Sequence, residues 1–151
     1  MARPRWRFTT NYHVHHRLQV GLEYNPKAEE LGPLFSLFLL TETATAPALF
    51  IGTSSDRIGS PAGKHAYFAT ASKYIPVLHT SFYGSLNYSE WDDGFNFPVG
   101  LGIELGKGFS VRPMYDGDRS HLLLNYFATH FGVSLMYVWL ETPGVAFYVG
   151  F

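Results

Sequence analysis

The chain opens with a long run in which apolar and polar positions alternate. From Trp6 to Tyr24, most even-numbered positions are apolar or aromatic, and nearly all charged side chains stand at odd-numbered positions. A strand keeps such a separation and a helix does not, because strand side chains alternate with a period of two. Two arrangements preserve the alternation: one long strand, or a hairpin that turns at His15–Arg17. We favour the single strand.

The same period of two recurs in the second half of the chain. The segments Phe95–Leu105 and Phe109–Tyr115 each place apolar side chains at the odd positions, and Gly106–Gly108 forms a tight turn between them. The last residues, Val145–Phe151, repeat the pattern. Pro98 lacks the amide hydrogen that a sheet ladder needs, so we expect a bulge or a local edge there.

Shorter apolar segments fill the rest of the chain and are bounded by residues that favour turns. Together with the runs above, they predict an all-β, antiparallel up-and-down barrel of ten strands in one domain, residues 1–151; eight or twelve strands also fit. The additional strands are predicted at Leu34–Thr41, Ala48–Ser54, His65–Tyr74, Val77–Tyr88, His121–Phe131 and Val133–Leu140.

Connections of two lengths alternate along the predicted strands. The longer set includes Asn25–Gly32, Ser54–Lys64, Ser89–Gly94 and Tyr115–Ser120, with Glu141–Gly144 as its shortest member. The shorter set includes Ile75–Pro76, Gly106–Gly108 and the single residue Gly132, together with the longer Glu42–Pro47. Because successive connections of an up-and-down sheet lie at opposite ends, one end of the sheet would carry the long loops.

Composition narrows the class of protein. Charged residues are 15% of the chain and aromatic residues 17%, whereas ordinary soluble domains have about 25% charged residues. The net charge of -1 gives no basis for nucleic-acid binding. There is no cysteine, so a disulfide framework is excluded. The longest apolar stretch, Leu34–Leu40, is too short for a membrane helix.

The C-terminal strand resembles that of bacterial outer-membrane β-barrel proteins. Val145, Phe147, Val149 and the terminal Phe151 share one face of this strand. In that family the last strand ends on Phe and is recognised by the barrel assembly machinery. The resemblance implies a bacterial outer-membrane location and contact with membrane lipid and lipopolysaccharide. The residues expected to face lipid are Val99, Leu101, Ile103, Phe147, Val149 and Phe151.

An exported barrel needs a signal peptide, and the N-terminal residues do not provide one. Basic residues precede Phe8, but no apolar segment follows them. Under the resemblance, the sequence would then be a mature or shortened form that begins with an added Met. Short periplasmic turns and long external loops are typical of the family.

The polar face of the predicted barrel carries a cluster of charged residues. A small barrel is filled by its own side chains, and buried charges must pair. We expect a hydrogen-bonded plug, with a narrow anion-favouring pore as the alternative. The cluster consists of Arg5, Arg7, His13, His15, Arg17, Glu23, Glu104, Arg112 and Asp116.

Catalytic and metal sites have weaker support. Asp116, Asp118, Ser120 and His121 cluster at one loop and supply the residue types of a hydrolase, with Asp118, Ser120 and His121 as the weak catalytic candidates. Ser120 and His121 are adjacent, however, and cannot easily face each other on one strand. His13, His15 and His16 lack a third ligand for a metal, and Glu90, Asp92 and Asp93 lack the spacing of a calcium loop. We therefore assign no catalytic residue, metal or cofactor.

Three functions follow from these patterns. The favoured one is an integral outer-membrane barrel that acts structurally, in adhesion, or as a narrow pore with a plugged, basic-lined lumen. The second is an outer-membrane enzyme that acts on lipid A or another surface substrate, and the third is a soluble barrel that binds a lipid or other ligand. The sequence does not define an oligomeric state.

Overall fold

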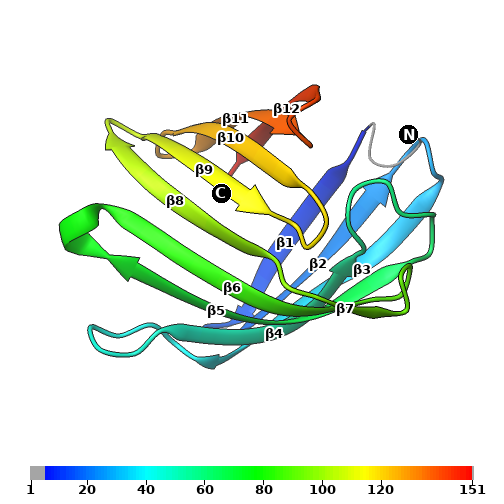
Figure 1. The fold of residues 1–151 in the computed structure, drawn as a ribbon, viewed down its shortest axis with the longest axis horizontal. Coiled ribbons are helices and arrows are strands. Elements are labelled where there is room, and N and C mark those ends of the chain that lie inside the picture. Colours follow the sequence, from blue (N-terminus) through cyan, green and yellow to red (C-terminus); the bar gives the residue numbers. More distant parts are fainter. Residues whose placement is uncertain (1–5, 151) are drawn as a thin grey trace. The chain divides into compact units, whose positions relative to one another are not determined.

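The structure is a computed structural model that describes residues 6–150. It is all-β, with 68% of residues in strands and no α-helix in the described part of the chain. The strands pair with antiparallel neighbours in a single sheet, in the order β1-β2-β3-β4-β5-β6-β8-β9-β10-β11-β12, and β7 pairs separately with β6. This up-and-down order is visible in Figure 1. Within residues 6–150, no helix has the length and apolar character needed to span a bilayer.

The sheet is not closed into a barrel, so the prediction of a closed barrel is not confirmed. β1 pairs with β2, β12 pairs with β11, and among the described residues no ladder joins β1 to β12. The antiparallel up-and-down sheet itself is as predicted. Alternation within each strand determines which face a side chain occupies, and it does not depend on whether the two edge strands meet.

The chain divides into two compact units. The first, residues 1–71 and 85–97, contains β1 to β4, β7, the start of β5 and the end of β6. Its strand bounds are β1 Phe8–His15, β2 Leu18–Asn25, β3 Glu30–Leu40, β4 Ala48–Ser55, β5 His65–Ile75, β6 Thr80–Ser89 and β7 Gly94–Asn96.

The second unit, residues 72–84 and 98–151, contains the remaining parts of β5 and β6, the short 3-10 helix η1 and the last five strands. Their bounds are η1 Pro76–Leu78, β8 Val99–Gly106, β9 Phe109–Tyr115, β10 Ser120–Phe127, β11 Phe131–Val138 and β12 Thr142–Val149. The turn predicted at Ile75–Pro76 falls where η1 joins β5 to β6.

The N-terminal run is a hairpin, and the single strand that we favoured for Trp6–Tyr24 is wrong. β1 and β2 pair with Phe8 opposite Tyr24 and Tyr12 opposite Val20. Even positions therefore face even positions, so the alternation continues unchanged through the turn. A bulge between His13 and His15 adjusts the register before the turn residues His16 and Arg17. Periodicity alone could not reveal this turn, because no Gly, Pro, Asn or Asp marks it.

Twelve strands occur within residues 6–150, where the favoured prediction was ten and twelve was an alternative. One additional strand comes from the division of Trp6–Tyr24 into β1 and β2. The other arises because the run Phe95–Leu105 breaks at Phe97 and Pro98 into β7 and β8, both of which pair with β6. The break occurs where Pro98 was expected to interrupt the ladder. The β7 and β8 segments thus pair in succession along β6, with an irregular link between them.

Two connections near the C-terminus also differ from the prediction. Gly132 lies inside β11, opposite Tyr148, and the turn instead occupies Ala128–His130. The turn predicted at Glu141–Gly144 lies earlier, at Trp139 and Leu140, which adopt φ values of 56° and 55°. Two successive residues with positive φ form the type of turn that matches the twist of a hairpin. Neither residue is one that the rule for such turns would select.

Burial is inverted relative to a water-soluble globular protein. Among residues 6–150, the apolar side chains that are buried are those of Ala48 and Ala66. In contrast, the buried polar and charged residues are Glu23, Asn25, Glu30, Asp56, Ser60, Thr70, Thr80, Ser89, His121, Asn125 and Ser134. Buried polar groups require hydrogen-bond partners, and most of these have them, as described below.

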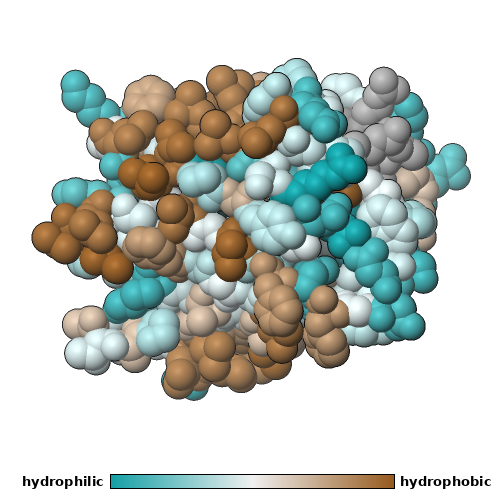
Figure 2. Space-filling model, viewed as in Figure 1, coloured by the Kyte–Doolittle hydropathy of each residue, from teal (hydrophilic) through white to brown (hydrophobic). Residues whose placement is uncertain are grey.

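Large apolar side chains lie on the opposite face of the strands. In the second unit, the ladders join Phe82 to Leu101, Leu124 to Leu135 and Val133 to Phe147 on one face. Phe147 is 76% exposed. Figure 2 shows how much of the visible surface is taken by apolar side chains. An exposed apolar surface of this kind marks an interaction with lipid or with another protein.

Candidate functional site

The best-defined polar pair in the second unit is Asp116 with His121. Asp116 follows the last residue of β9, and His121 is the second residue of β10, so a four-residue turn brings them together. The Nε2 atom of His121 lies 2.7 Å from Oδ2 of Asp116. The other carboxylate oxygen, Oδ1, accepts hydrogen bonds from the backbone N–H groups of Asp118 at 2.9 Å and Arg119 at 2.8 Å. His121 is buried.

These contacts keep the Asp116 carboxylate ionised. Burial alone raises the pKa of this carboxyl. The hydrogen bond to His121 and those from the backbone of Arg119 and Asp118 act in the opposite direction, and the net pKa lies below its ordinary value of 3.8. A carboxylate that is fixed in this way orients the imidazole and leaves Nδ1 as the ring nitrogen that can contact another group.

Two further polar side chains lie near this pair on the same face of the second unit. Arg112 stands opposite Leu123 and Met114 opposite His121, so Arg112 and His121 are diagonal neighbours across β9 and β10. The ring of Tyr83 leans across Gly100, where a Cβ atom would collide with it. Tyr83 is thereby directed toward β9, and the charges of both Arg112 and Asp116 act on its hydroxyl.

The structure does not assemble the three catalytic residue types named from the sequence. Ser120 is exposed and pairs with Tyr115, whereas His121, the next residue, projects from the other face of β10. Asp118 lies 3.6 Å from the Arg119 guanidinium. The partner of His121 is Asp116, which the sequence placed in the polar cluster of the lumen. The sequence carried one signal for this pair: Asp116 stands five residues before His121, at the end of a predicted strand.

In the first unit, Glu23 is the centre of a buried polar cluster. Its Oε1 accepts hydrogen bonds from Asn25 Nδ2 at 2.9 Å and from Ser55 Oγ at 2.6 Å. Arg7 lies 3.5 Å from Oε2, so two members of the predicted charged cluster form an ion pair. Arg5, the neighbouring member of the predicted cluster, lies outside the described residues.

The other predicted lumen residues are spread along the sheet. His13 and His15 are exposed on β1, and Arg17 is exposed in the turn that follows. His15 Nδ1 accepts a long hydrogen bond of 3.4 Å from the backbone of Arg17. In the second unit, Glu104 accepts a hydrogen bond of 2.8 Å from the Tyr74 hydroxyl.

A network that the sequence did not predict joins two long loops of the first unit. Asp56, in the loop Asp56–Lys64, accepts hydrogen bonds on Oδ2 from Ser89 Oγ at 2.7 Å and from the backbone N–H of Trp91 at 3.1 Å. Arg57 makes a bidentate ion pair with Asp92 and stacks 4.9 Å above the Trp91 ring. These contacts fix the two loops against each other.

Glu90 completes this junction. Its carboxylate accepts hydrogen bonds from the backbone N–H of His65 at 2.9 Å and from the Tyr67 hydroxyl at 2.9 Å. Both hydrogen bonds lower the pKa of the Glu90 carboxyl below its ordinary value of 4.5, and the one from His65 has the larger effect. From the sequence, Glu90, Asp92 and Asp93 were judged to lack the spacing of a calcium loop. In the structure, Glu90 and Asp92 hold neighbouring elements.

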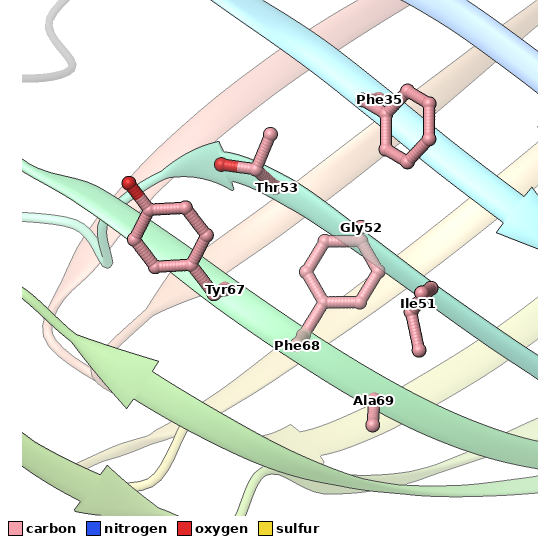
Figure 3. Close-up of a pocket in the computed structure, with 7 residues that line it drawn as sticks. All are labelled: Phe35, Ile51, Gly52, Thr53, Tyr67, Phe68 and Ala69. Carbon is pink, nitrogen blue, oxygen red and sulfur yellow. The ribbon is translucent and has the colours of Figure 1, made fainter.

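A groove of about 420 Å³ opens on the first unit across β3, β4 and β5 (Figure 3). Its lining is almost entirely apolar, and Gly52 at its floor has no side chain. None of the residues that line it is charged. The residues that line it are Phe35, Ile51, Gly52, Thr53, Tyr67, Phe68 and Ala69.

The residues predicted to face lipid lie on the apolar face where the structure describes them. Val99, Phe147 and Val149 are exposed, and Leu101 and Ile103 are half-buried between neighbouring side chains. Phe151 lies outside the described residues. Contact of these side chains with lipid stays a prediction.

No cluster of three or more His, Cys, Asp or Glu residues that could hold a metal ion occurs within residues 6–150. Comparisons with family models, with curated proteins and with solved structures found no match for this chain.

Proposed function

We propose that this chain is an integral β-barrel protein of the bacterial outer membrane, with a structural or adhesive role or a narrow pore. The observation that carries the proposal is the inverted burial: Glu23, Asn25 and Ser134 are buried, whereas Phe147 and Val149 are exposed. In water, this arrangement would expose apolar area at a cost of about 25 cal/mol for each Å². In a bilayer the same side chains face hydrocarbon and the cost disappears.

The interior contacts favour a plugged lumen over an open pore. The Glu23 cluster and a second group, in which the buried Asn125 contacts the buried Ser134 and the half-buried Ser110, form hydrogen bonds on the polar face. Hydrogen bonds between side chains of neighbouring strands fill space on the polar face and hold those strands together. A water-filled channel would not need these contacts, because water could satisfy each group.

Closure of the barrel is part of this proposal. A closed barrel has no edge strand and so avoids unpaired backbone groups in lipid. Eleven strands lie on the path of the sheet, an odd number, so closure by β1 and β12 would pair them in parallel. Single-chain bacterial barrels have even strand numbers, which makes this junction the least usual element of the proposed architecture.

The test is extraction and electrophoresis of the protein expressed with an export signal. We expect it to fractionate with outer membranes, to need detergent for extraction, and to migrate faster on SDS gels before heating than after. A soluble ligand-binding barrel would leave the membrane fraction without detergent and would not show the shift. Quantitative recovery in the aqueous fraction, with a folded CD spectrum, would overturn the proposal.

The Asp116–His121 pair favours a second candidate function, an outer-membrane enzyme that acts on lipid A or another surface substrate. A buried histidine held by an ionised carboxylate has the geometry of a general base. The matched variants are His121→Ala and Ser120→Ala, assayed on purified lipid A and on a reporter ester. Hydrolysis that depends on His121 and not on Ser120 would support this candidate. Absence of hydrolysis by the folded wild-type protein would exclude it for these substrates.

A further inference from the structure

Strand β1 forms an open edge of the sheet. It is the first strand in the order and pairs, among the described strands, with β2 alone. All eight of its residues are exposed, including those on the polar face, whereas Glu23 and Asn25 on the same face of β2 are buried. The described residues therefore leave the second edge of β1 without a neighbouring strand.

This edge lacks the features that usually prevent a sheet from pairing with another chain. Protected edges carry prolines, charged side chains or bulges. Phe8–His15 contains no Pro, Lys, Arg, Asp or Glu, and its bulge lies beside the turn, between His13 and His15. Most of its residues are Phe, Thr, Tyr or Val, which favour strands. In contrast, the last strand of the order, β12, includes Pro143, which has no amide hydrogen to donate.

The free backbone groups of β1 determine what can pair with it. In an antiparallel ladder, alternate residues direct their N–H and C=O groups to the same neighbour, so half of the residues of β1 direct them away from β2. In a bilayer, no water satisfies these groups. An extended strand presents the matching row of donors and acceptors.

Building on the proposed function, we propose that the free edge of β1 binds an extended strand of another polypeptide, antiparallel to β1. Side chains of paired strands lie beside each other on the same face. The added strand is therefore apolar on the face of Phe8 and Tyr12, and polar or small on the face of Thr9 and Asn11.

The number of strands supports an antiparallel addition. Eleven strands lie on the path of the sheet, so direct pairing of β1 with β12 is parallel. One strand added antiparallel to β1 makes the number even, as in known bacterial barrels. Each strand within residues 6–150 already has its place in the order, so the added strand comes from outside this range.

The test uses the detergent-solubilised protein and a fluorescent synthetic peptide with the sequence of residues 18–25, which form β2 and already pair antiparallel with β1. Fluorescence anisotropy measures its binding. Two modified peptides provide the matched comparison: one is N-methylated at Val20 and Leu22, the other at Gly21 and Glu23. Each has two added methyl groups, and they block opposite edges of the peptide.

We expect one methylated peptide to bind like the unmodified peptide and the other to bind about tenfold more weakly or less, because its hydrogen bonds to β1 are lost. A benzophenone group in place of the Tyr24 side chain of the peptide locates the contact. Cross-links mapped by mass spectrometry should lie within Phe8–His15, and cross-links confined to β12 or to the loops would overturn the proposal.

Absence of saturable binding to the folded protein would also overturn it. Equal binding by both methylated peptides would do the same, since it would indicate apolar attachment without a ladder. Equal loss in both would indicate that the peptide displaces β2, which needs both of its edges to pair with β1 and β3, and would equally reject the free edge as the site.

The electrophoretic test of the proposed function separates the two failures. A protein that shows the heat-dependent gel shift and binds no peptide would reject pairing at β1 and leave the proposed membrane location intact. A protein recovered in the aqueous fraction that binds one methylated peptide selectively would support pairing at β1 and reject the membrane location.

Discussion

Ser89 Oγ donates a hydrogen bond of 2.7 Å to Oδ2 of Asp56, and both side chains are buried although 33 residues separate them in the chain. The same Ser89 oxygen accepts a hydrogen bond from the backbone N–H of Asp92 at 3.1 Å. One hydroxyl thus links a carboxylate of one loop with the backbone of the next. The network depends on a serine that no sequence motif distinguished.

Ser89→Ala should destabilise the protein by about 1–3 kcal/mol, because it leaves a buried carboxylate oxygen short of a donor and a backbone N–H without its acceptor. Chemical unfolding in detergent measures the change. Ser120→Ala removes a hydroxyl at an exposed position and should stay within about 0.5 kcal/mol of the wild type. Similar losses in both variants would show that Ser89 does not link the loops.

Leu101→Arg should impair folding into lipid, at a cost of roughly 2–4 kcal/mol if the residue lies near the midplane of the bilayer. Leu101 pairs with Phe82 on the apolar face, whereas Asn96 pairs with Asn87 on the polar face. Asn96→Arg should therefore be tolerated better. Refolding yields into phospholipid vesicles compare the two variants, and equal tolerance would reject the assignment of faces.

Acid should destabilise the loop at Asp116. The pKa of Asp116 in the folded protein lies below 3.8, so its ionised form stabilises the fold above that pH, and this contribution is lost as the pH falls through the lowered pKa. Asp116→Asn should be less stable than the wild type at pH 6, and the difference should shrink below about pH 3.8. Unfolding midpoints at both pH values measure it. A difference that is independent of pH would contradict this origin.

Gly132→Ala should destabilise β11 by about 1–3 kcal/mol, because a methyl group at this position would collide with the Phe127 ring and lie 3.2 Å from the backbone oxygen of Tyr126. Gly150→Ala is the control, since no atom lies within 4 Å of the position that its Cβ would occupy. Thermal unfolding compares the two. Equal effects would show that close packing at Gly132 is not the cause.

Deletion of Phe151 should reduce membrane assembly in cells more than refolding into detergent. If the terminal Phe is part of an assembly signal, its loss matters only where the assembly machinery acts. In a soluble barrel, the deletion would cost at most about 1.5–3 kcal/mol, the value of a buried aromatic side chain, in either setting. Assembly in cells and refolding in vitro of the same deletion distinguish these outcomes, and equal effects would count against the outer-membrane proposal.

The period-two pattern was sufficient to predict the all-β class and the faces of most strands, because alternation survives turns that preserve parity. It could not separate β1 from β2, since Phe8 and Tyr24 remain on one face in either arrangement. It also misplaced the last hairpin, because Trp139 and Leu140 adopt positive φ without a residue type that favours it.

The candidate site was predicted only in part. Arg7–Glu23 was expected from the pairing of charges on one polar face, and it is present. Asp116 and His121 were placed in one loop cluster from the sequence, but their direct hydrogen bond was not predicted, because it depends on the backbone path of the four turn residues, which the pattern does not encode. The hydrogen bonds of Asp56 join two loops that lie close together because of the order of the strands in the sheet. The two loops are far apart in the sequence, so the alternation pattern did not reveal their contact.

The shared anchoring of two loops has a consequence for how this protein can diverge. Because Asp56 and Arg57 hold Ser89, Trp91 and Asp92, neither loop can gain or lose residues without disturbing the other. A change in the length of one loop would therefore act on both. Substitutions at position 56 should be inherited together with compensating substitutions at position 89, so the two loops should evolve as one unit.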